Sequence, residues 1–226
     1  MKESRTDQAR DWCLIIPVKR LEIAKSRLDG DLGAHRADFA LAFALDTVAA
    51  ALRTRGVTEV IVVTDDPRVG QAVRGLGAHV VPDRPAAGLN PALSWGARVA
   101  EQGRPGAPVG ALSGDLPALR PAELSAVLGF AGEPEAEGRP TVVADAAGRG
   151  TTLYLAGPGT PFAPAFGAAS LAAHLQAGAR EFAGERIPSV RQDVDTIADL
   201  RAARELGLGA HTAELVERLH DRQIGA

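Results

Sequence analysis

The chain has 226 residues, of which 46% are hydrophobic and 23% charged, and its formal net charge is -3 at pH 7. This balance excludes a disordered chain, which could not bury enough apolar surface to offset its ordering entropy. It also lacks the basic excess typical of nucleic-acid binding. The one cysteine, Cys13, excludes an intramolecular disulfide and a multi-cysteine zinc site.

The length suits a single domain, predicted to span residues 12–226 after a loose tail at residues 1–11. The tail is polar and has no apolar region of the kind found in signal peptides. No apolar run in the sequence reaches the roughly 18 residues of a membrane-spanning helix. We therefore expect a cytoplasmic protein that binds neither a membrane nor nucleic acid.

The first part of the chain alternates short apolar runs with amphipathic segments. The apolar runs predict strands at residues 14–18, 57–64, 79–81 and 109–113. Apolar spacings of three and four residues, and prolines at favourable helix starts, predict helices at residues 36–53 and from Pro67, Pro91 and Pro121. Continuous apolar strands that alternate with helices are typical of an α/β sandwich, so we expect three layers around a mostly parallel central sheet.

The last part of the chain is divided by glycine and proline. Residues 131–140 are predicted to be an exposed connection, and residues 157–167 are predicted to be a loop that covers a functional site. We predict strands at residues 141–145 and 152–155, a helix at 168–181, a strand end at 193–195, a helix capped by Thr196, and a final helix at 212–220.

Three aspartates, Asp115, Asp193 and Asp195, follow predicted strands. Sheets of this kind bind ligands at the carboxyl ends of their strands, and residues two apart on an extended backbone share one face. Three carboxylates together would suit Mg²⁺, which shares such sites with substrate phosphates. Each aspartate alone is equally well explained as a turn or cap residue, but the three together favour a metal site.

The segment after the first strand is basic. It contains Lys19, Lys25 and Arg27, so two of the chain's three lysines fall within seven residues. Three cations could bind a triphosphate or a second phosphorylated substrate. A solvated charged loop is the commoner explanation of such a run, and the scarcity of lysine shifts the balance modestly toward a functional role.

Other polar residues have two interpretations each. Gly88 would let a ligand approach a helix start, and Asn90 could contact a base or ribose, although Asn90 is also explained as a helix cap. Hydroxyls and amides at residues 149–152 and 166–170 suit an anion, or else a hairpin turn and a helix cap. His174 is by default a packing or surface residue.

Several common motifs are absent from the sequence. No glycine-rich dinucleotide motif follows a strand, and there is no P-loop, no His-Glu-x-x-His and no nucleophile elbow. A Rossmann oxidoreductase is therefore the weakest alternative.

Five blocks, in order, resemble a known family. They are Ile16-Pro17-Val18-Lys19 with Ala24-Lys25-Ser26-Arg27-Leu28, Gly88-Leu89-Asn90 with Ala92-Leu93, Gly114-Asp115-Leu116-Pro117, Gly150-Thr151-Thr152-x-Leu with Phe166-Gly167-x-x-Ser170 and His174, and Asp193-x-Asp195-Thr196-x-x-Asp199-Leu200. Over roughly residues 13–206, their order and spacing resemble the guanylyltransferases of coenzyme F-420 biosynthesis, a family that includes 2-phospho-L-lactate guanylyltransferase and its phosphoenolpyruvate-using relatives.

The resemblance implies a nucleotidyltransferase-type Rossmann-like fold that takes GTP and a small phosphorylated C3 acid. It implies that Mg²⁺, expected as two ions, is bound by Asp115, Asp193 and Asp195. It implies that the acid is bound by Thr152, Gly167 and Ser170. One block departs from the archaeal-type Gly-Gly-Thr-Asn, since this chain has Arg-Gly-Thr-Thr at 149–152, which is more similar to actinobacterial members that use phosphoenolpyruvate.

The expected reaction joins GTP to phosphoenolpyruvate and gives enolpyruvyl-diphospho-guanosine and pyrophosphate. Lys19, Lys25 and Arg27 are the predicted catalytic cations, which bind the triphosphate. The predicted nucleotide contacts come from Lys19, Lys25, Gly88, Asn90 and Gly114. Hand-over of the labile product to the next enzyme of the pathway is a further expectation.

The alternatives concern the acceptor and the class of protein. The acceptor could be 2-phospho-L-lactate or 3-phosphoglycerate. A molybdenum-cofactor-type nucleotidyltransferase would usually carry a glycine-rich loop where this chain has Pro17-Val18-Lys19. In a different class, a non-catalytic GTP-binding sensor would bind the nucleotide without releasing pyrophosphate.

Overall fold

A computed structural model describes residues 11–22, 33–84, 86–133, 138–184 and 186–224. These described residues form one seven-stranded sheet in the order β3-β2-β1-β4-β6-β5-β7. Its strands are β1 (Trp12–Pro17), β2 (Val57–Val63), β3 (His79–Val81), β4 (Val109–Leu112), β5 (Thr141–Ala144), β6 (Thr151–Ala156) and β7 (Arg180–Glu181). β1 pairs in parallel with β2 and β4, and β2 with β3. β6 runs antiparallel to both β4 and β5, and β7 is parallel to β5.

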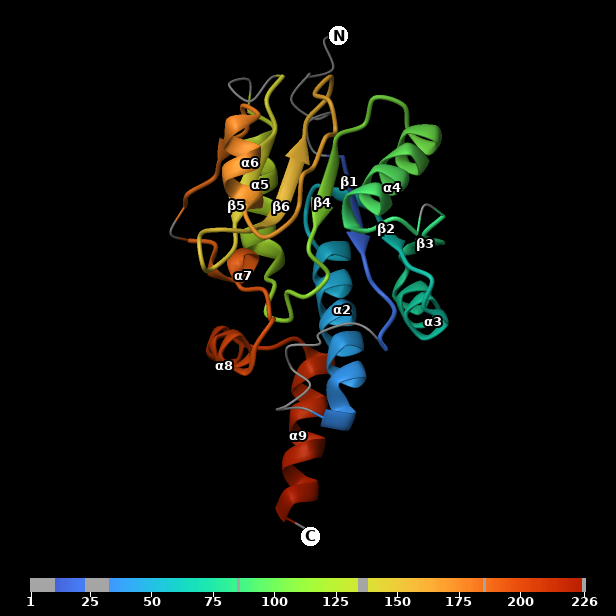
Figure 1. Ribbon diagram of the computed structural model, residues 1–226, viewed down its shortest axis with the longest axis vertical. Coiled ribbons are helices and arrows are strands. Elements are labelled where there is room, and N and C mark those ends of the chain that lie inside the picture. The colour runs from blue at the N-terminus through green and yellow to red at the C-terminus, as the bar shows by residue number, and fades with distance from the viewer. Residues whose placement is uncertain (1–10, 23–32, 85, 134–137, 185, 225–226) are drawn as a thin grey trace.

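Helices cover both faces of the sheet (Figure 1). They are η3 (Gly33–His35), α2 (Arg36–Leu52), α3 (Pro67–Leu76), α4 (Leu89–Gly103), α5 (Pro121–Ala131), α6 (Ser170–Gln176), α7 (Pro188–Arg191), α8 (Ile197–Leu206) and α9 (Ala210–Ile224). Buried side chains of α2, α3, α5 and α7 share one core with the sheet, and those of α4 share the other. The fold is therefore the three-layer α/β sandwich with a mostly parallel sheet that the sequence predicted.

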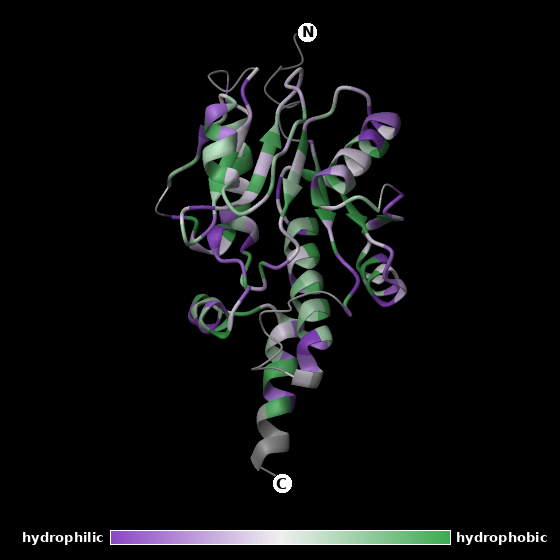
Figure 2. Cartoon of the chain, in the orientation of Figure 1, coloured by the Kyte–Doolittle hydropathy of each residue, from purple (hydrophilic) through white to green (hydrophobic). Residues whose placement is uncertain are grey.

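The strands are buried because successive side chains enter opposite cores. On β1, Leu14 and Ile16 pack on the α2 side, whereas Cys13 and Ile15 pack on the α4 side. All four are at most 1% exposed. This alternation follows from the two-residue repeat of a strand, and it explains the band of hydrophobic colour through the centre of the molecule (Figure 2).

A third core lies beyond the sheet, where α9 runs beside α2 (Figure 1). It includes Phe39 and Phe43 of α2 and Leu215 of α9. The Asp46 carboxylate of α2 accepts the backbone N–H groups of His211 at 3.0 Å and Thr212 at 2.8 Å, and so binds the first turn of α9. Negative charge is stabilising at a helix N-terminus.

Most predicted elements are confirmed within a residue or two, including α2, β2, β3, α5 and β5. Thr196 caps α8 through a capping box with Asp199, as expected. The predicted helix at 168–181 is shorter: α6 ends at Gln176, and the two residues of β7 pair with β5. A two-residue edge strand carries too little periodicity to be recognised in a sequence.

Two other predictions are wrong. Residues 193–195 are not a strand end, because the one-turn helix α7 precedes them and the Asp193 amide donates to the Arg191 carbonyl at 3.1 Å. Asn90 does not cap α4, since the helix begins at Leu89 and its cap residue is Gly88, with φ +106°.

None of the described helices is long and apolar enough to cross a membrane. Of the predicted tail at residues 1–11, only Asp11 is described. The predicted connection at 131–140 follows α5 and is described except at residues 134–137.

Candidate active site

Two adjacent cavities lie at the carboxyl ends of the parallel strands. The central cavity, of about 250 Å³, is lined by Pro17, Val18, Lys19, Ala40, Leu89, Leu93, Leu112, Ser113, Gly114, Asp115, Phe166 and Asp195. The lateral cavity, of about 260 Å³, is lined by Pro17, Val18, Lys19, Arg20, Val63, Asp65, Asp83, Ala86, Gly88, Leu89 and Ala92. Because the two share the end of β1 and the start of α4, they form neighbouring parts of one site, as expected for ligands of such sheets.

Lys19 lies at the boundary of the two cavities, two residues after β1. The Val18 amide continues the pairing with β2 by donating to the Val63 carbonyl at 3.0 Å. Two residues after Lys19, Leu21 is 2% exposed and packs in the core. Lys19 is thus an exposed cation between two anchored apolar residues.

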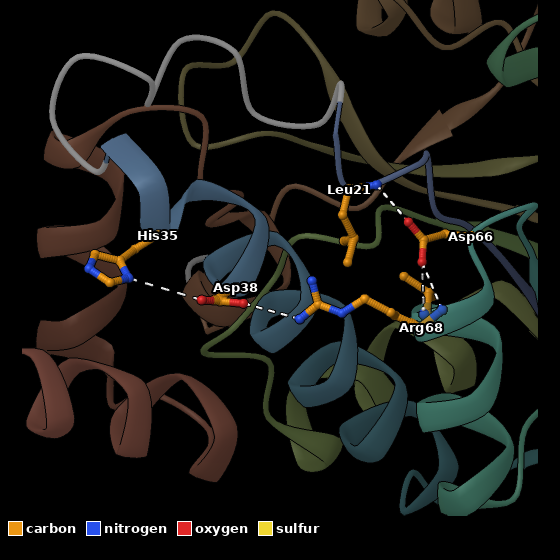
Figure 3. Close-up of polar contacts among 6 residues, drawn as sticks. Leu21, His35, Asp38, Asp66 and Arg68 are labelled. Atoms are coloured by element: carbon orange, nitrogen blue, oxygen red, sulfur yellow. Dashed lines mark hydrogen bonds and ion pairs between the residues drawn. The ribbon is translucent and has the colours of Figure 1, made fainter.

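Asp66 fixes the segment that carries Lys19 to the start of α3 (Figure 3). Its Oδ2 accepts the Leu21 amide at 2.9 Å, and its Oδ1 accepts the amides of Arg68 at 2.9 Å and Val69 at 3.2 Å. Burial by itself raises the pKa of Asp66, but these three amides and the charge of Arg68 together lower it below its usual value. The Arg68 side chain also donates to Asp38 at 3.1 Å, which links α3 to the first turn of α2.

Asp115 is positioned by contacts of the two residues that flank it in the sequence, Gly114 and Leu116. A Cβ atom on Gly114 would lie 3.1 Å from the Pro17 carbonyl oxygen, so glycine allows the end of β4 to approach β1 closely. The next amide, of Leu116, donates to the buried Thr47 Oγ1 at 2.9 Å, and that hydroxyl donates to the Phe43 carbonyl at 2.8 Å.

The Asp115 carbonyl accepts the Val194 amide at 3.1 Å, so two segments separated by most of the second half of the chain lie side by side. Asp115 and Asp195 consequently line the same central cavity. Asp193 is not among the described residues that line either cavity.

The predicted cluster of three metal-binding aspartates is only partly assembled. Among the described residues, no three His, Cys, Asp or Glu side chains are grouped so that they could hold a metal ion. Mg²⁺, however, is usually bound by one or two carboxylates, with water and substrate phosphates supplying the other oxygens. Asp115 and Asp195 in one cavity fit that kind of site.

None of the three residues predicted to bind the acid is among the described lining residues of the central cavity, although Thr152 contacts one of them and Gly167 follows another, Phe166. Thr152 is fully buried on β6, and its carbonyl accepts the amide of Ser113, a cavity residue, at 2.8 Å. Ser170 is 2% exposed at the start of α6. Neither hydroxyl has a hydrogen-bond partner within the described part of the chain. Gly167 is exposed, and a Cβ there would meet no described atom within 4 Å.

In the loop predicted at residues 157–167, Phe166 is the residue that lines the central cavity. In the sequence Phe166 is only one residue of a motif, and no pattern indicated Ser113, Leu89 and Leu93 as lining residues or Thr47 as a support. The position of Ser113 directly before Gly114 could have indicated its role. A buried threonine within an apolar helix such as α2 gives no signal that its hydroxyl binds a distant amide.

The remaining predicted site residues have mixed outcomes. Gly114 lines the central cavity and Gly88 the lateral one. Both polar atoms of the Asn90 amide pair with the Phe166 backbone, and its predicted nucleotide contact stays a prediction. Lys25 and Arg27 lie outside the described residues.

A family model and two solved structures are similar to this chain. Residues 38–194 match the family of the MobA-like NTP transferase domain. A nucleotidyl transferase from Methanothermobacter superposes with a TM-score of 0.53 over 87% of this chain and 97% of its own, at 18% identity. The 4-diphosphocytidyl-2C-methyl-D-erythritol synthase of Anaerococcus prevotii superposes with a TM-score of 0.55 over 90% of this chain and 98% of its own, at 9% identity. At these identities the two structures support the fold alone.

Two curated relatives are much closer in sequence. The phosphoenolpyruvate guanylyltransferase of Thermomonospora curvata is 54% identical over 99% of this chain and 96% of its own length. That of Streptomyces coelicolor is 53% identical over 92% of this chain and 97% of its own length. This chain is therefore a nucleotidyltransferase that belongs to the phosphoenolpyruvate guanylyltransferase family within the MobA-like NTP transferases.

Proposed function

We propose that this guanylyltransferase joins GTP to phosphoenolpyruvate, as a step of coenzyme F-420 biosynthesis. A phosphate oxygen of phosphoenolpyruvate attacks the α-phosphorus of GTP. The bond from that phosphorus to the oxygen bridging to the β-phosphate breaks, pyrophosphate leaves, and the product is enolpyruvyl-diphospho-guanosine. The observation that carries the proposal is the central cavity, where Asp115, Asp195 and Lys19 from three separate segments meet.

The main barrier to this reaction is electrostatic, because two polyanions must come together. One pair of unit charges at 4 Å interacts by about 4 kcal/mol at an effective dielectric constant of about 20. Lys19 supplies a positive charge between the two cavities. Asp115 and Asp195 would hold Mg²⁺, and a bound metal ion neutralises charge on transferring phosphoryl groups.

The reaction needs neither a covalent intermediate nor a strong base. A phosphate monoester is mostly dianionic near neutral pH and is itself the nucleophile. Burial, together with the nearby carboxylate of Glu59, raises the pKa of the Cys13 thiol to about 12, so the thiol stays protonated. Positioning and charge neutralisation are then the main tasks of the protein.

The two cavities suit different parts of the substrates. We assign the guanosine to the lateral cavity, where Gly88 leaves space and the carboxylates of Asp65 and Asp83 could accept the N–H groups of guanine. We assign the triphosphate and the acid to the central cavity. Within the described residues the hydroxyls of Thr152 and Ser170 have no partner, and the backbone at Gly167 is open, which supports an acid site beside Phe166.

The test is to offer GTP and Mg²⁺ with phosphoenolpyruvate, 2-phospho-L-lactate or 3-phosphoglycerate in separate reactions. Released pyrophosphate and the mass of the nucleotide product are measured, with ATP in place of GTP as a control. We expect the fastest pyrophosphate release with GTP and phosphoenolpyruvate. Faster turnover with another acid would identify that acid as the substrate. GTP binding without pyrophosphate release, whichever acid is present, would indicate a sensor.

A further inference from the structure

The loop between β6 and α6 has no regular secondary structure at residues 161–166, yet side chains from three elements bind its backbone. The Tyr154 hydroxyl of β6 accepts the Ala163 amide at 3.3 Å and donates to the Pro161 carbonyl at 3.4 Å. The next contacts fall on Ala165 and Phe166, the residues that precede the predicted acid-binding Gly167. These two residues are therefore fixed from outside the loop.

Asn90, the only asparagine in the chain, binds both backbone groups of Phe166. Its Oδ1 accepts the Phe166 amide at 2.8 Å, and its Nδ2 donates to the Phe166 carbonyl at 3.0 Å. A side-chain amide offers a donor and an acceptor side by side, as a neighbouring strand would. Asn90 lies in the first turn of α4, next to Leu89, which lines both cavities.

His174 of α6 binds the adjacent residue. Its Nε2 is 2.7 Å from the Ala165 amide, which donates to it, so the neutral ring carries its proton on Nδ1. Nδ1 is 3.1 Å from Thr151 Oγ1 on β6. The ring also meets the Phe166 ring edge to face, at 5.7 Å between centroids. His174 is 1% exposed, so its ring is shielded from water, and its contact with Thr151 is buried.

We propose that Asn90 and His174 are positioning residues for the acid substrate, because together they fix Phe166, which forms one wall of the central cavity, and its neighbour Ala165. Asn90 ties this wall to the helix whose start lines the lateral cavity, and His174 ties it to the helix that begins with Ser170. The inference rests on the proposed function, since it assumes that the acid binds beside Phe166. It gives Asn90 a role different from the nucleotide contact that the sequence predicted.

The first test measures hydrogen exchange of individual backbone amides in the free protein, so it does not depend on the identity of the substrate. Asn90→Ala should speed exchange of the Phe166 amide by about tenfold, and His174→Leu should do the same for Ala165. His174→Gln, which keeps an acceptor, should restore most of the protection. Ser125→Ala removes a long-range hydrogen bond to the Arg55 carbonyl, at 3.1 Å and outside both cavities, and should leave both amides unchanged.

The second test separates the KM values of the two substrates. Asn90→Ala should raise the KM for phosphoenolpyruvate about tenfold and leave the KM for GTP within about twofold. In the double variant with His174→Leu, the KM for phosphoenolpyruvate should rise by less than the product of the two single increases, because both side chains hold one segment.

Unchanged exchange of Phe166 in Asn90→Ala, or a rise confined to the KM for GTP, would overturn the inference. If no acid supports pyrophosphate release, the proposed function fails, and the exchange rates alone then decide whether Asn90 and His174 fix the loop.

Discussion

The two halves of the sheet position their site residues by different means. In the parallel half, Lys19 and Asp115 follow β1 and β4 by two and three residues, so the strand ladders themselves bring them to the cavity. In the antiparallel half, Phe166 lies ten residues beyond β6 and is held by Asn90, 76 residues away in the sequence. The comparison indicates that the ends of paired strands place Lys19 and Asp115, whereas the placement of Phe166 depends on side chains that contact an irregular loop.

The largest effect is expected from removing a carboxylate of the central cavity. Asp115→Asn and Asp195→Asn should each lower kcat by about 10²–10³-fold, because each removes charge that would hold Mg²⁺ against the phosphates. Pyrophosphate release over a Mg²⁺ titration measures the loss, and thermal unfolding checks the fold. Activity within a few-fold of wild type would remove that aspartate from the proposed site. An equally large loss in Asp193→Asn would extend the site to all three predicted aspartates.

The next effect tests how the parallel half supports Asp115. Thr47→Val leaves the buried Leu116 amide without its acceptor, which costs about 1–3 kcal/mol, and we expect kcat to fall about tenfold as Asp115 shifts. Thr54→Val is a matched control, since the Thr54 hydroxyl is also buried and donates to a carbonyl four residues back, that of Ala50 at 2.8 Å. Equal losses of kcat in both variants would mean that Thr47 acts only through stability.

A smaller effect is expected for Lys19, because its ammonium is exposed and partly screened. Lys19→Met should raise the KM for GTP about fivefold, since each 1.4 kcal/mol of lost charge interaction is worth tenfold and exposure reduces that value. Arg53→Met, an exposed cation at the end of α2, is the control. An unchanged KM for GTP would place the triphosphate away from the boundary between the two cavities.

The contrast between the halves also explains what the sequence could predict. Continuous apolar runs located β1, β2 and β4, and the residues directly after them were found by the rule for strand ends. Asp193 and Asp195 were also singled out, although the strand expected to carry them is absent from residues 192–196. Backbone hydrogen bonding between Val194 and Asp115 positions that segment instead. The roles of Thr47 and Asn90 depend on partners 69 and 76 residues away, and no local pattern encodes such contacts.

The smallest expected effect concerns the buried imidazole of the antiparallel half. Burial lowers the pKa of His174, so the folded protein favours the neutral ring, whereas the unfolded chain takes up the proton below about pH 6.5. Because the unfolded state then binds more protons, the free energy of unfolding should fall as the pH drops below that value. Urea titrations between pH 7.5 and 5 should show a shallower decline for His174→Gln than for wild type, since the other four histidines are common to both. Parallel curves would mean that folding does not lower the pKa of His174. They would then give no support for a neutral ring whose Nε2 accepts the Ala165 amide.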